Sequence, residues 1–279
     1  MRKVSKGLVS VIVGTKNEAE VVGRLLGSIG RQSCKQVEMI VVDNESADET
    51  VRIARLYTDL VFKKGPERSA QRNFGARQAR GEYLLFLDAD MELSGKAVEE
   101  CVRLVRKDRK VGAAMIPEES VAEGYWEKVK AFERSFYSLA GDRSVEAARF
   151  FRREVFEKVG GYDETMWAAE DWDLSERVRK AGFKIGRIKA KIYHYERIRS
   201  LWSLFGKKYY YGLNSYRYLT KHKLPLVGAK TVYFLRPVFW RQWRRALVNP
   251  GLTIGMVVMF LGESVAGGVG VVVGKLTGR

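Results

Sequence analysis

Short aliphatic runs alternate with amphipathic stretches along the first half of the chain. Val9 to Val13, Glu38 to Val42 and Tyr83 to Leu87 have the composition of buried strands. Stretches with helical periodicity, such as Glu18 to Gly30 and Asp48 to Leu60, separate them. This alternation is typical of βαβ units, whose strands are parallel. The chain is therefore predicted to be an α/β protein with a mostly parallel sheet flanked by helices.

A polar cluster follows each of these three runs. The clusters are Gly14 to Glu18, Asp43 to Ser46, and Asp88 to Asp90. Ligands of open parallel sheets collect at the carboxyl ends of the strands. The three clusters are therefore expected to line one crevice.

The third cluster, Asp88-Ala89-Asp90, places two carboxylates at the end of a buried strand. Residues i and i+2 of an extended segment point to the same side, so both carboxylates can address one hard divalent cation and a bound diphosphate. Acidic pairs also end strands as ordinary solvated turns. The triplet alone does not separate these two interpretations, and the motifs elsewhere in the chain favour the cation.

Composition indicates an ordered protein with one large domain and an appendage. The chain has 279 residues, 46% of them hydrophobic, which is enough for a sizeable core. Cys34 and Cys101 lie far apart without metal-ligand spacing, and the run Leu8 to Val13 is too short and wrongly flanked for a secretory signal. We expect a reducing cytosolic location for the main domain. Charged residues make up 30% of the chain, a balance that leans toward a thermophilic source.

The net charge of +17 is concentrated in the last part of the chain. From Leu201 onward, 12 Lys and Arg residues stand against the single acidic residue Glu263. Aromatic residues are interleaved with these cations: Trp202, Phe205, Tyr209 to Tyr211, Tyr233, Phe234, Phe239, Trp240 and Trp243. A basic tail can bind nucleic acid, but this mixture suits an anionic membrane surface at least as well.

The segment Leu252 to Val273 is long enough to span a bilayer and carries one charge, Glu263. Its glycines and this glutamate lower its tendency to insert. A spanning helix, a re-entrant segment and a helix that docks with a partner all remain open. We expect membrane association from this segment.

A second aromatic pattern, over Tyr125 to Tyr137, marks one face of a predicted helix. Such a face is most often core, and the alternative is a lid or a membrane-facing surface beside the acceptor. A helix is also predicted over Ser94 to Lys107, a strand over Val111 to Ile116, and a further helix over Asp171 to Lys180.

Residues 8 to about 196 resemble the inverting family 2 glycosyltransferases with the GT-A fold. Val11 to Glu18 is similar to that family's first strand and its Pro-Thr-x-Asn-Glu turn, with Gly14 in place of the proline. Ile40 to Asp48 is similar to the second strand, and Ala70 to Ala76 to the helix before the Asp-x-Asp strand.

The resemblance implies a site for a nucleotide diphosphate sugar. Asp43 would hydrogen-bond the base and Arg72 would contact the nucleotide, although Arg72 could also be a solvated helix cation. The resemblance assigns nucleotide-sugar contacts to Thr15, Asn17, Glu18, Asp43, Ser46, Arg72, Asp88 and Ala89.

The same resemblance implies a Mn²⁺ or Mg²⁺ ion bridging the two phosphates. Asp90 would be the closer metal ligand, and Asp88 would lie nearer the ribose and the metal water. His194, in the strand-like segment Ile192 to Tyr195, would give a further metal or diphosphate contact. A lone histidine is also often structural.

Trp167 to Arg177 is similar to the family's Glu-Asp motif at the start of a helix. Inverting transfer is a single displacement, and one carboxylate must accept the proton of the attacking hydroxyl. By resemblance this base is Asp171, with Glu170 positioning substrate. A helix N-terminus also favours carboxylates for capping and dipole reasons alone, which is the alternative for both residues and for Asp173.

Three further side chains are candidates for sugar or acceptor contacts. Trp167 and Trp172 could stack on a sugar, although Trp near a helix start more often packs. Arg197 could neutralise the diphosphate.

These observations predict a glycosyltransferase domain over residues 1–200 and membrane-associating helices over 201–279. Within the domain, 1–91 would be the nucleotide-binding half and 92–200 the acceptor half. We expect a UDP-sugar donor, because Asp43 fits a uracil partner, and an acceptor hydroxyl on a membrane- or lipid-linked glycan. The expected location is the cytoplasmic face of the membrane.

Two other functions compete with this one. A polyprenyl-phosphate glycosyltransferase would use a phosphate acceptor, which is already an anionic nucleophile and needs no base. The Glu170-Asp171 pair therefore favours the hydroxyl acceptor. A non-catalytic nucleotide-sugar or nucleic-acid binding module would explain the basic charge but not the ordered motifs, so no nucleic-acid partner is expected.

Overall fold

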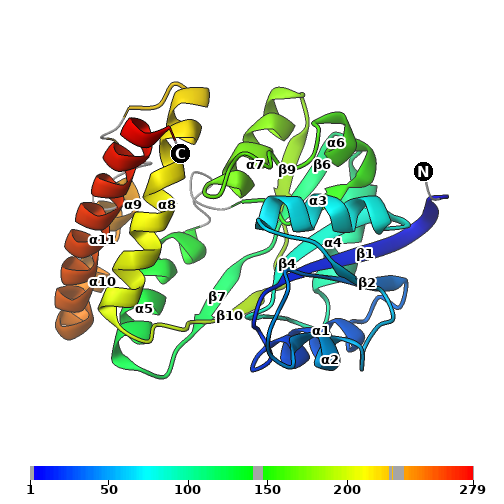
Figure 1. Cartoon of the computed structure of the whole chain (residues 1–279), viewed down its shortest axis with the longest axis horizontal. Coiled ribbons are helices and arrows are strands. Elements are labelled where there is room, and N and C mark those ends of the chain that lie inside the picture. The colour runs from blue at the N-terminus through cyan, green and yellow to red at the C-terminus, as the bar shows by residue number, and fades with distance from the viewer. Residues whose placement is uncertain (1–2, 141–146, 226–227, 229–235, 279) are drawn as a thin grey trace. The chain divides into compact units, whose positions relative to one another are not determined.

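The computed structural model describes residues 3–140, 147–225, 228 and 236–278. The chain divides into two compact units. The first, here called the sheet unit, comprises Met1–Glu118, Ala147–Glu164 and Glu170–His194; the second, the helical unit, comprises Glu119–Glu146, Thr165–Ala169 and Tyr195–Arg279. Figure 1 shows the elements of both units.

The sheet unit is built on a mostly parallel sheet. In the described part of the chain the strand order is β3-β2-β1-β4-β8-β6-β9. Strands β1, β2, β3 and β4 run parallel, β9 is parallel to β6, and β8 is antiparallel to both β4 and β6. The bounds are β1 Ser5–Thr15, β2 Val37–Asp43, β3 Val61–Lys63, β4 Gly81–Asp88, β6 Val111–Met115, β8 Phe150–Arg152 and β9 Lys184–Arg187. The predicted fold class is confirmed.

Helices cover both faces of this sheet, and the strand residues alternate between the two faces. Val11 and Leu85 pack in one core with α1 (Val22–Gly30) and α4 (Ala97–Lys107). Ile12 and Phe86 pack in the other core with α3 (Arg68–Gln78), α6 (Arg153–Lys158) and α7 (Glu170–Lys180). The short helix α2 (Thr50–Ala54) follows β2 (Figure 1).

Strand register brings the polar clusters to one edge of the sheet. Thr15 of β1 pairs with Asp43 of β2, and Gly14 pairs with Asp88 of β4. The three strands therefore end at the same level. Gly75 in α3 permits the close approach of this helix, because a Cβ there would overlap the side chain of Ile12.

A second sheet has the strand order β5-β10-β7. Its strands are β5 Met91–Leu93, β7 Glu118–Val121 and β10 Ile192–Tyr195. Strand β10 is antiparallel to β5 and places His194 opposite Met91, the residue after Asp90. The boundary between the two units falls within β7 and β10.

The helical unit contains α5 (Tyr125–Ala140), α8 (Leu201–Lys221), α9 (Pro237–Arg241), α10 (Trp243–Val248) and α11 (Pro250–Thr277). Val129 and Phe136 of α5 are buried with Leu204, Met259 and Phe260 in the core of this unit. The aromatic face predicted over Tyr125 to Tyr137 is therefore mainly core, although Tyr125 itself is half exposed.

Glycines allow α8 and α11 to pack closely, and Figure 1 shows the two helices side by side. A Cβ on Gly270 or Gly274 of α11 would overlap backbone atoms of α8, and one on Gly212 of α8 would overlap α11. Small residues at such positions let two helix backbones approach. The glycines that lower the tendency of this segment to insert into a membrane thus form a surface on which α8 packs.

Glu263 of α11 also faces the interior of the helical unit. Its side chain is fully buried, 3.0 Å from Lys130 Nζ and 3.5 Å from Lys208 Nζ. Lys130 also pairs with Glu133 at 2.5 Å. Buried charges are retained where they are paired, so this cluster removes the isolated charge that the sequence placed in the apolar segment.

Candidate active site

Asp43, at the end of β2, organises the loops that follow β1 and β2. Its carboxylate accepts hydrogen bonds from Thr15 Oγ1 at 2.8 Å, from the Ser46 backbone N–H at 2.8 Å and from Ser46 Oγ at 2.6 Å. An ionised carboxylate offers about four acceptor positions. One position is left for a further donor, such as an N–H of a nucleotide base. The hydrogen bond between Asp43 and the base stays a prediction.

Asn17 and Glu18 are held in the same pair of loops. Asn17 has a positive φ of 55°, donates its N–H to Ser46 Oγ and accepts from the Ala47 N–H at 2.9 Å. The Glu18 N–H donates to Thr50 Oγ1 at 2.8 Å. Left-handed backbone at a non-glycine residue is a local strain that often occurs at functional loops. The contacts of Asn17 and Glu18 with the nucleotide sugar stay predictions.

Gln71 is a residue whose role the sequence did not reveal. Its amide donates to the carbonyl of Thr15 at 3.0 Å and to that of Val42 at 2.7 Å, and it is buried. It therefore joins the ends of β1 and β2 from α3. The motif Ala70 to Ala76 contains it, and an amide with two N–H donors suits this bridge.

Arg72 is buried beneath three carboxylates. With 2% of its side chain exposed, it donates from Nη2 to Asp88 Oδ1 at 2.7 Å and from Nη1 to Asp171 Oδ1 at 3.0 Å and Glu170 Oε1 at 3.4 Å. Its guanidinium also lies 5.1 Å from the ring centre of Tyr162. The solvated-cation interpretation is therefore wrong, and a direct contact between Arg72 and the nucleotide stays a prediction.

The charges of this cluster stabilise one another. Burial alone would raise the pKa of Asp88, but the guanidiniums of Arg72 and Arg149 hold that pKa well below its ordinary value. Burial likewise disfavours the charge of Arg72, and the carboxylates of Asp171 and Asp88 outweigh it and raise the arginine's pKa. Both effects are those expected for opposite charges at hydrogen-bonding distance.

The Glu-Asp motif opens α7, as predicted, and its two carboxylates differ in access. The Glu170 side chain is 4% exposed, and that of Asp171 is 25% exposed. Burial raises the pKa of Glu170, which also pairs with Arg68 at 3.3 Å. Asp173 is fully buried against Arg177, so its role is structural. Asp171 is therefore the more accessible of the two carboxylates, and its role as the base stays a prediction.

The Asp88-Ala89-Asp90 triplet differs from the extended geometry expected from sequence. Strand β4 ends at Asp88, and Ala89 and Asp90 form a turn. Asp88 engages Arg72, whereas Asp90 Oδ2 lies 3.3 Å from His194 Nε2. The turn gives the two carboxylates different partners, and Ala89 is buried between them.

Asp90 and His194 fit a divalent cation of the Mn²⁺ type. Asp90 Oδ1 is buried without a hydrogen-bond partner in the described part of the chain, and the other oxygen of the same carboxylate, Oδ2, lies 3.3 Å from His194 Nε2. Among the described residues no group of three or more His, Cys, Asp or Glu side chains forms a complete metal cage. Cations that serve phosphate substrates commonly take one or two protein carboxylates and complete their shell with phosphate and water.

Glu118 and Arg149 complete this cluster, and neither was predicted from the sequence. Arg149 donates from Nε to Glu118 Oε1 at 2.7 Å and from Nη1 to Asp88 Oδ2 at 3.3 Å. Glu118 Oε2 lies 3.4 Å from His194 Nδ1. Arg149 precedes β8, whose antiparallel pairing with β4 brings it beside the end of that strand. No motif marks either residue, since both depend on long-range pairing.

Three predicted sugar or acceptor contacts remain, Trp167, Trp172 and Arg197, and their roles stay predictions. Trp172 is half buried on α7. Trp167 and Arg197 belong to the helical unit, where Trp167 stacks on Tyr210 with ring centres 5.8 Å apart and donates its backbone N–H to Asn214. Packing explains the conformation of Trp167.

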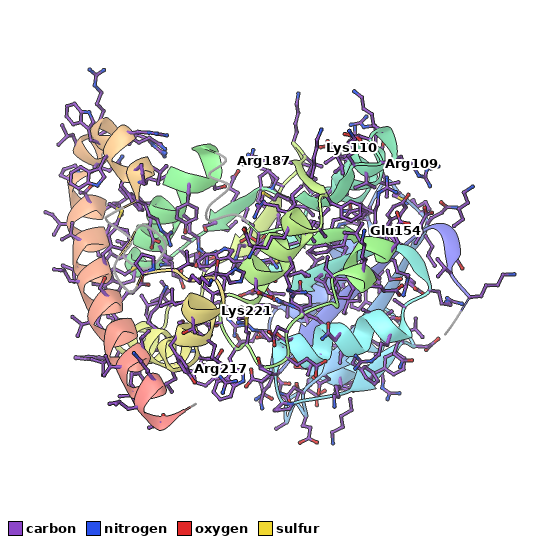
Figure 2. The ribbon with its side chains drawn as sticks, turned by 90° about the horizontal axis from the view of Figure 1, so that it is seen from above. Arg109, Lys110, Glu154, Arg187, Arg217 and Lys221 are labelled. Carbon is purple, nitrogen blue, oxygen red and sulfur yellow. The ribbon has the colours of Figure 1, made fainter. Side chains whose placement is uncertain are left out.

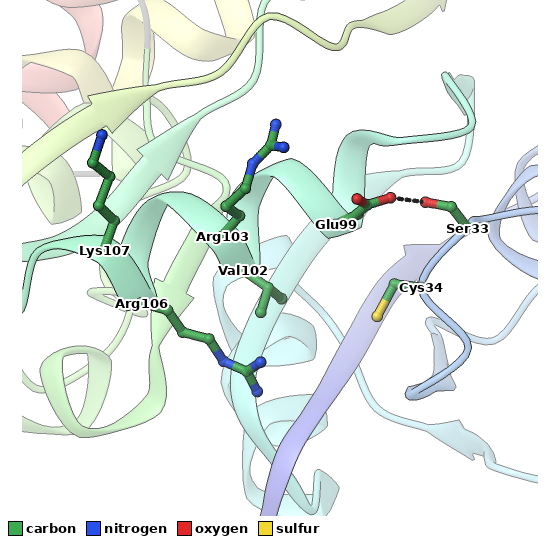
Figure 3. A pocket seen from close by; sticks show the side chains of 7 residues that line it. All are labelled: Ser33, Cys34, Glu99, Val102, Arg103, Arg106 and Lys107. Atoms are coloured by element: carbon green, nitrogen blue, oxygen red, sulfur yellow. Dashed lines mark hydrogen bonds between the residues drawn. The ribbon is translucent and has the colours of Figure 1, made fainter.

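A separate surface pocket of the sheet unit contains none of the predicted site residues. Ser33, Cys34 and α4 residues that include Glu99, Arg103 and Arg106 line it. Figure 3 shows this wall and the hydrogen bond between Ser33 Oγ and Glu99, which measures 2.6 Å. Ser33 and Cys34 of this pocket lie before the start of β2, whereas the carboxylates of the candidate site lie at or after the carboxyl ends of the strands.

The open, mostly parallel sheet with polar side chains at the carboxyl ends of its strands defines a ligand-binding α/β protein. A family model described as glycosyl transferase family 2 matches residues 10–160, and one described as the N-terminal domain of galactosyltransferase matches residues 129–201. The chain belongs to glycosyl transferase family 2, and the enzyme is a glycosyltransferase.

Relatives and solved structures agree with this assignment. The PGL/p-HBAD biosynthesis glycosyltransferase of Mycobacterium bovis is 30% identical over 184 residues, which cover 60% of this chain and 68% of the relative. The poly(ribitol-phosphate) beta-N-acetylglucosaminyltransferase TarS of Staphylococcus aureus is 24% identical over 206 residues, covering 67% of this chain and 35% of TarS.

Two solved structures share the fold. TarS residues 1–349 in complex with UDP-GlcNAc match with a TM-score of 0.53 and 19% identity, over 92% of this chain and 81% of that one. The mannosyltransferase PcManGT of Pyrobaculum calidifontis, in complex with GDP-Man and Mn²⁺, matches with a TM-score of 0.56 and 20% identity, over 97% and 79%. The predicted family and the GT-A fold are confirmed.

Proposed function

We propose that this glycosyltransferase carries out metal-dependent, inverting transfer of a sugar from a UDP-sugar to a hydroxyl of a membrane- or lipid-linked acceptor. The observation that carries the proposal is the Arg72 bridge. One buried guanidinium binds Asp88 of the Asp-x-Asp triplet at 2.7 Å and Asp171 of the Glu-Asp motif at 3.0 Å. It fixes the proton acceptor relative to the donor end of the site.

In this mechanism the acceptor oxygen attacks the anomeric carbon while the bond to the diphosphate breaks. Asp171 takes the hydroxyl proton as the new bond forms. Arg72 holds one oxygen of that carboxylate, so the acceptor must approach the other. Glu170, buried and less readily ionised, shares Arg72 and orients the turn. A divalent cation held by Asp90 and His194 would stabilise the charge on the leaving diphosphate.

The Asp171→Asn variant tests the proton acceptor. The amide keeps the shape of the side chain and removes its basicity, so we expect a loss of turnover of 100-fold or more, in the ~10²–10⁴ range of general base catalysis. UDP affinity in the presence of Mn²⁺, measured by calorimetry, should change little. Glu67→Gln, which alters a residue at the N-terminal boundary of α3, is the control. Unchanged turnover in Asp171→Asn would falsify its role as the base.

A phosphate acceptor is the competing proposal for the same fold. A phosphate monoester is anionic at neutral pH and needs no proton acceptor. The partly exposed Asp171 carboxylate has no task in that reaction, which favours the hydroxyl acceptor. Assays with a polyprenyl phosphate and with a lipid-linked saccharide separate the two, and turnover of the phosphate alone would establish the competitor.

The preference for UDP rests on Asp43. Its remaining acceptor position suits an N–H donor of a pyrimidine base, and the TarS structure contains UDP-GlcNAc. The PcManGT structure contains GDP-Man, so a guanine nucleotide is the direct competitor. A thermal-shift series with UDP- and GDP-sugars plus Mn²⁺ decides, because a ligand bound only by the native state raises its stability.

The helical unit is proposed to bind an anionic membrane. By length and composition, helix α11 is long and apolar enough to cross a membrane, and 28% of its most apolar stretch is buried. Its outward face is a continuous apolar stripe that includes Ile254, Leu261, Val265, Val272 and Leu276. A contiguous exposed apolar patch marks an interaction site. Glu263 and the glycines face inward, so the stripe is free of charge.

Charge complementarity favours lipid over a second protein copy as the occupant. The last 79 residues carry 12 Lys and Arg residues. Figure 2 labels two of them, Arg217 and Lys221 on α8. At high salt, where the charge attraction is screened, the double variant Leu261→Asp/Val265→Asp should lose flotation with phosphatidylglycerol vesicles, whereas Leu56→Asp, at a site 72% exposed in the sheet unit, should not. If the wild type forms dimers on a sizing column, and the double variant loses them but still floats with the vesicles, the stripe would instead be a self-association surface.

A further inference from the structure

Glu118 and Asp90 lie at opposite nitrogens of the His194 ring. Nε2 is 3.3 Å from Asp90 Oδ2, and Nδ1 is 3.4 Å from Glu118 Oε2. We propose that Glu118 is a positioning residue for the divalent cation: it accepts the Nδ1–H hydrogen bond and thereby leaves the Nε2 lone pair to the metal. The inference rests on the proposed function, which places the cation beside Asp90.

Backbone pairing fixes the three side chains. His194 pairs with Met91 across β10 and β5, so its ring lies beside Asp90. Glu118 begins β7 directly after Pro117, whose carbonyl accepts the N–H of Ile192 at 2.9 Å. Strand hydrogen bonds thus place the His194 ring between the carboxylates of Asp90 and Glu118.

The chemistry of imidazole makes Glu118 necessary in this arrangement. A neutral ring carries one N–H and one lone pair, and a metal binds only the nitrogen with the lone pair. The other nitrogen then bears the hydrogen and needs an acceptor, which in metal sites is commonly a carboxylate. Glu118 is that carboxylate. Without it the ring could rotate or change tautomer and turn an N–H toward Asp90.

Arg149 binds the carboxylate oxygen of Glu118 that does not face His194. Its Nε donates to Glu118 Oε1 at 2.7 Å, and 12% of its side chain is exposed. The same guanidinium reaches Asp88 at 3.3 Å. Glu118 therefore has one oxygen for the arginine and one for the histidine. A purely structural glutamate would bind only the arginine, and its loss would not change metal affinity. A glutamate that also positions His194 would lower metal affinity when removed.

The test is Mn²⁺ binding to the full chain in the presence of UDP, followed by electron paramagnetic resonance. Glu118→Ala should weaken Mn²⁺ affinity by about 10–100-fold, the usual effect of removing a carboxylate that orients a metal-bound histidine. Glu118→Gln keeps an acceptor oxygen and should restore part of the affinity. Glu119→Ala, at the exposed neighbouring position, is the matched control and should bind as the wild type does.

A spectroscopic signature separates positioning from stability. Pulsed resonance of the wild type should show ¹⁴N coupling from the His194 imidazole, which His194→Ala should abolish; His222→Ala should not, and these are the chain's two histidines. Unchanged Mn²⁺ affinity in Glu118→Ala overturns the proposal. Absence of ¹⁴N coupling in a wild type whose binding still needs Asp90 also overturns it, and leaves the proposed function intact. A wild type that binds UDP without Mn²⁺ contradicts both.

Discussion

Arg72 shows how much one buried side chain can organise. Its guanidinium binds carboxylates from β4 and from both residues of the Glu-Asp motif. Arginine suits this task because its planar fork remains charged and presents several donors at fixed angles. The sequence identified the residue through a motif, but its burial among acids depends on where α3 and α7 meet the sheet.

Removal of this cation should be severe. Arg72→Met leaves Asp88, Glu170 and Asp171 close together without their shared partner, and we expect a loss of about 3–5 kcal/mol in the free energy of unfolding. Urea denaturation, followed by a signal from the sheet unit, measures this free energy. Arg77→Met, on the same helix at a side chain 60% exposed, should change the free energy by under about 0.5 kcal/mol. Equal effects from the two variants would contradict the central role of Arg72.

Glu38 gives a pH-dependent prediction outside the site. Burial would raise its pKa, but hydrogen bonds from Ser10 Oγ at 2.5 Å and from the Arg80 N–H at 2.6 Å outweigh burial and lower it. A lowered native pKa means that the unfolded chain binds more protons in acid. The stabilisation is present above the ordinary pKa of 4.5 in the unfolded chain and is lost as the pH falls through the lower native pKa.

Glu38→Gln should therefore be less stable than the wild type at pH 7, by about 1–3 kcal/mol for the disturbed buried bonds. The difference should narrow as the pH falls below 4, because the wild type then loses the same contribution. Thermal melts at pH 7, 5 and 3.5 measure this. Glu20→Gln, at an exposed position, is the control, and a gap that stays constant over this range would refute the linkage.

At the level of elements, the sequence predicted those with strong periodicity. The runs Val9 to Val13, Glu38 to Val42, Tyr83 to Leu87 and Val111 to Ile116 became β1, β2, β4 and β6. The helix predicted over Asp48 to Leu60 shrank to Thr50–Ala54, since Thr58 instead bonds the carbonyl of Met39 and the chain leaves the helix before β3.

The short strands β5, β7 and β8 escaped prediction because they have only three or four residues and lack a pattern. They nevertheless place His194, Glu118 and Arg149 in the site. Local sequence therefore revealed the residues at the ends of long strands. It could not reveal those whose position depends on pairing between distant segments, because no local signal encodes that pairing.

The glycines of α11 allow an element-scale test with an internal control. A Cβ at Gly270 would overlap the backbone of α8, whereas Gly268 has open space around it. Gly270→Ala should destabilise the α8–α11 pair by about 1–3 kcal/mol through overpacking. Gly268→Ala should be neutral or stabilising by about 0.4–1 kcal/mol, because alanine restricts the unfolded chain and favours helix. Thermal melts followed by far-UV circular dichroism compare the two, and equal shifts would contradict the packing argument.

For the whole molecule, the uneven charge has a physical consequence for membrane binding. The sequence carries +17 overall, with a large share on the helical unit's C-terminal part. Each Lys or Arg near an anionic surface contributes about 1 kcal/mol, and this attraction falls off within a Debye length. In the proposed membrane binding, the apolar stripe of α11 would contribute a second term that salt does not screen. The two terms respond to different variables, so they can be measured separately.

Salt should therefore weaken membrane binding without abolishing it. The Debye length shrinks from about 10 Å at 0.1 M salt to about 3 Å at 1 M. Between these concentrations, affinity for phosphatidylglycerol vesicles should fall at least tenfold, whereas the weaker affinity for phosphatidylcholine vesicles should stay nearly constant. Vesicle sedimentation measures both. Leu261→Asp/Val265→Asp should remove the salt-resistant part only, because the cations of the helical unit remain. Equal salt dependence on the two lipids would show that the basic residues do not face the membrane, and protein that detergent alone releases would identify α11 as a true span.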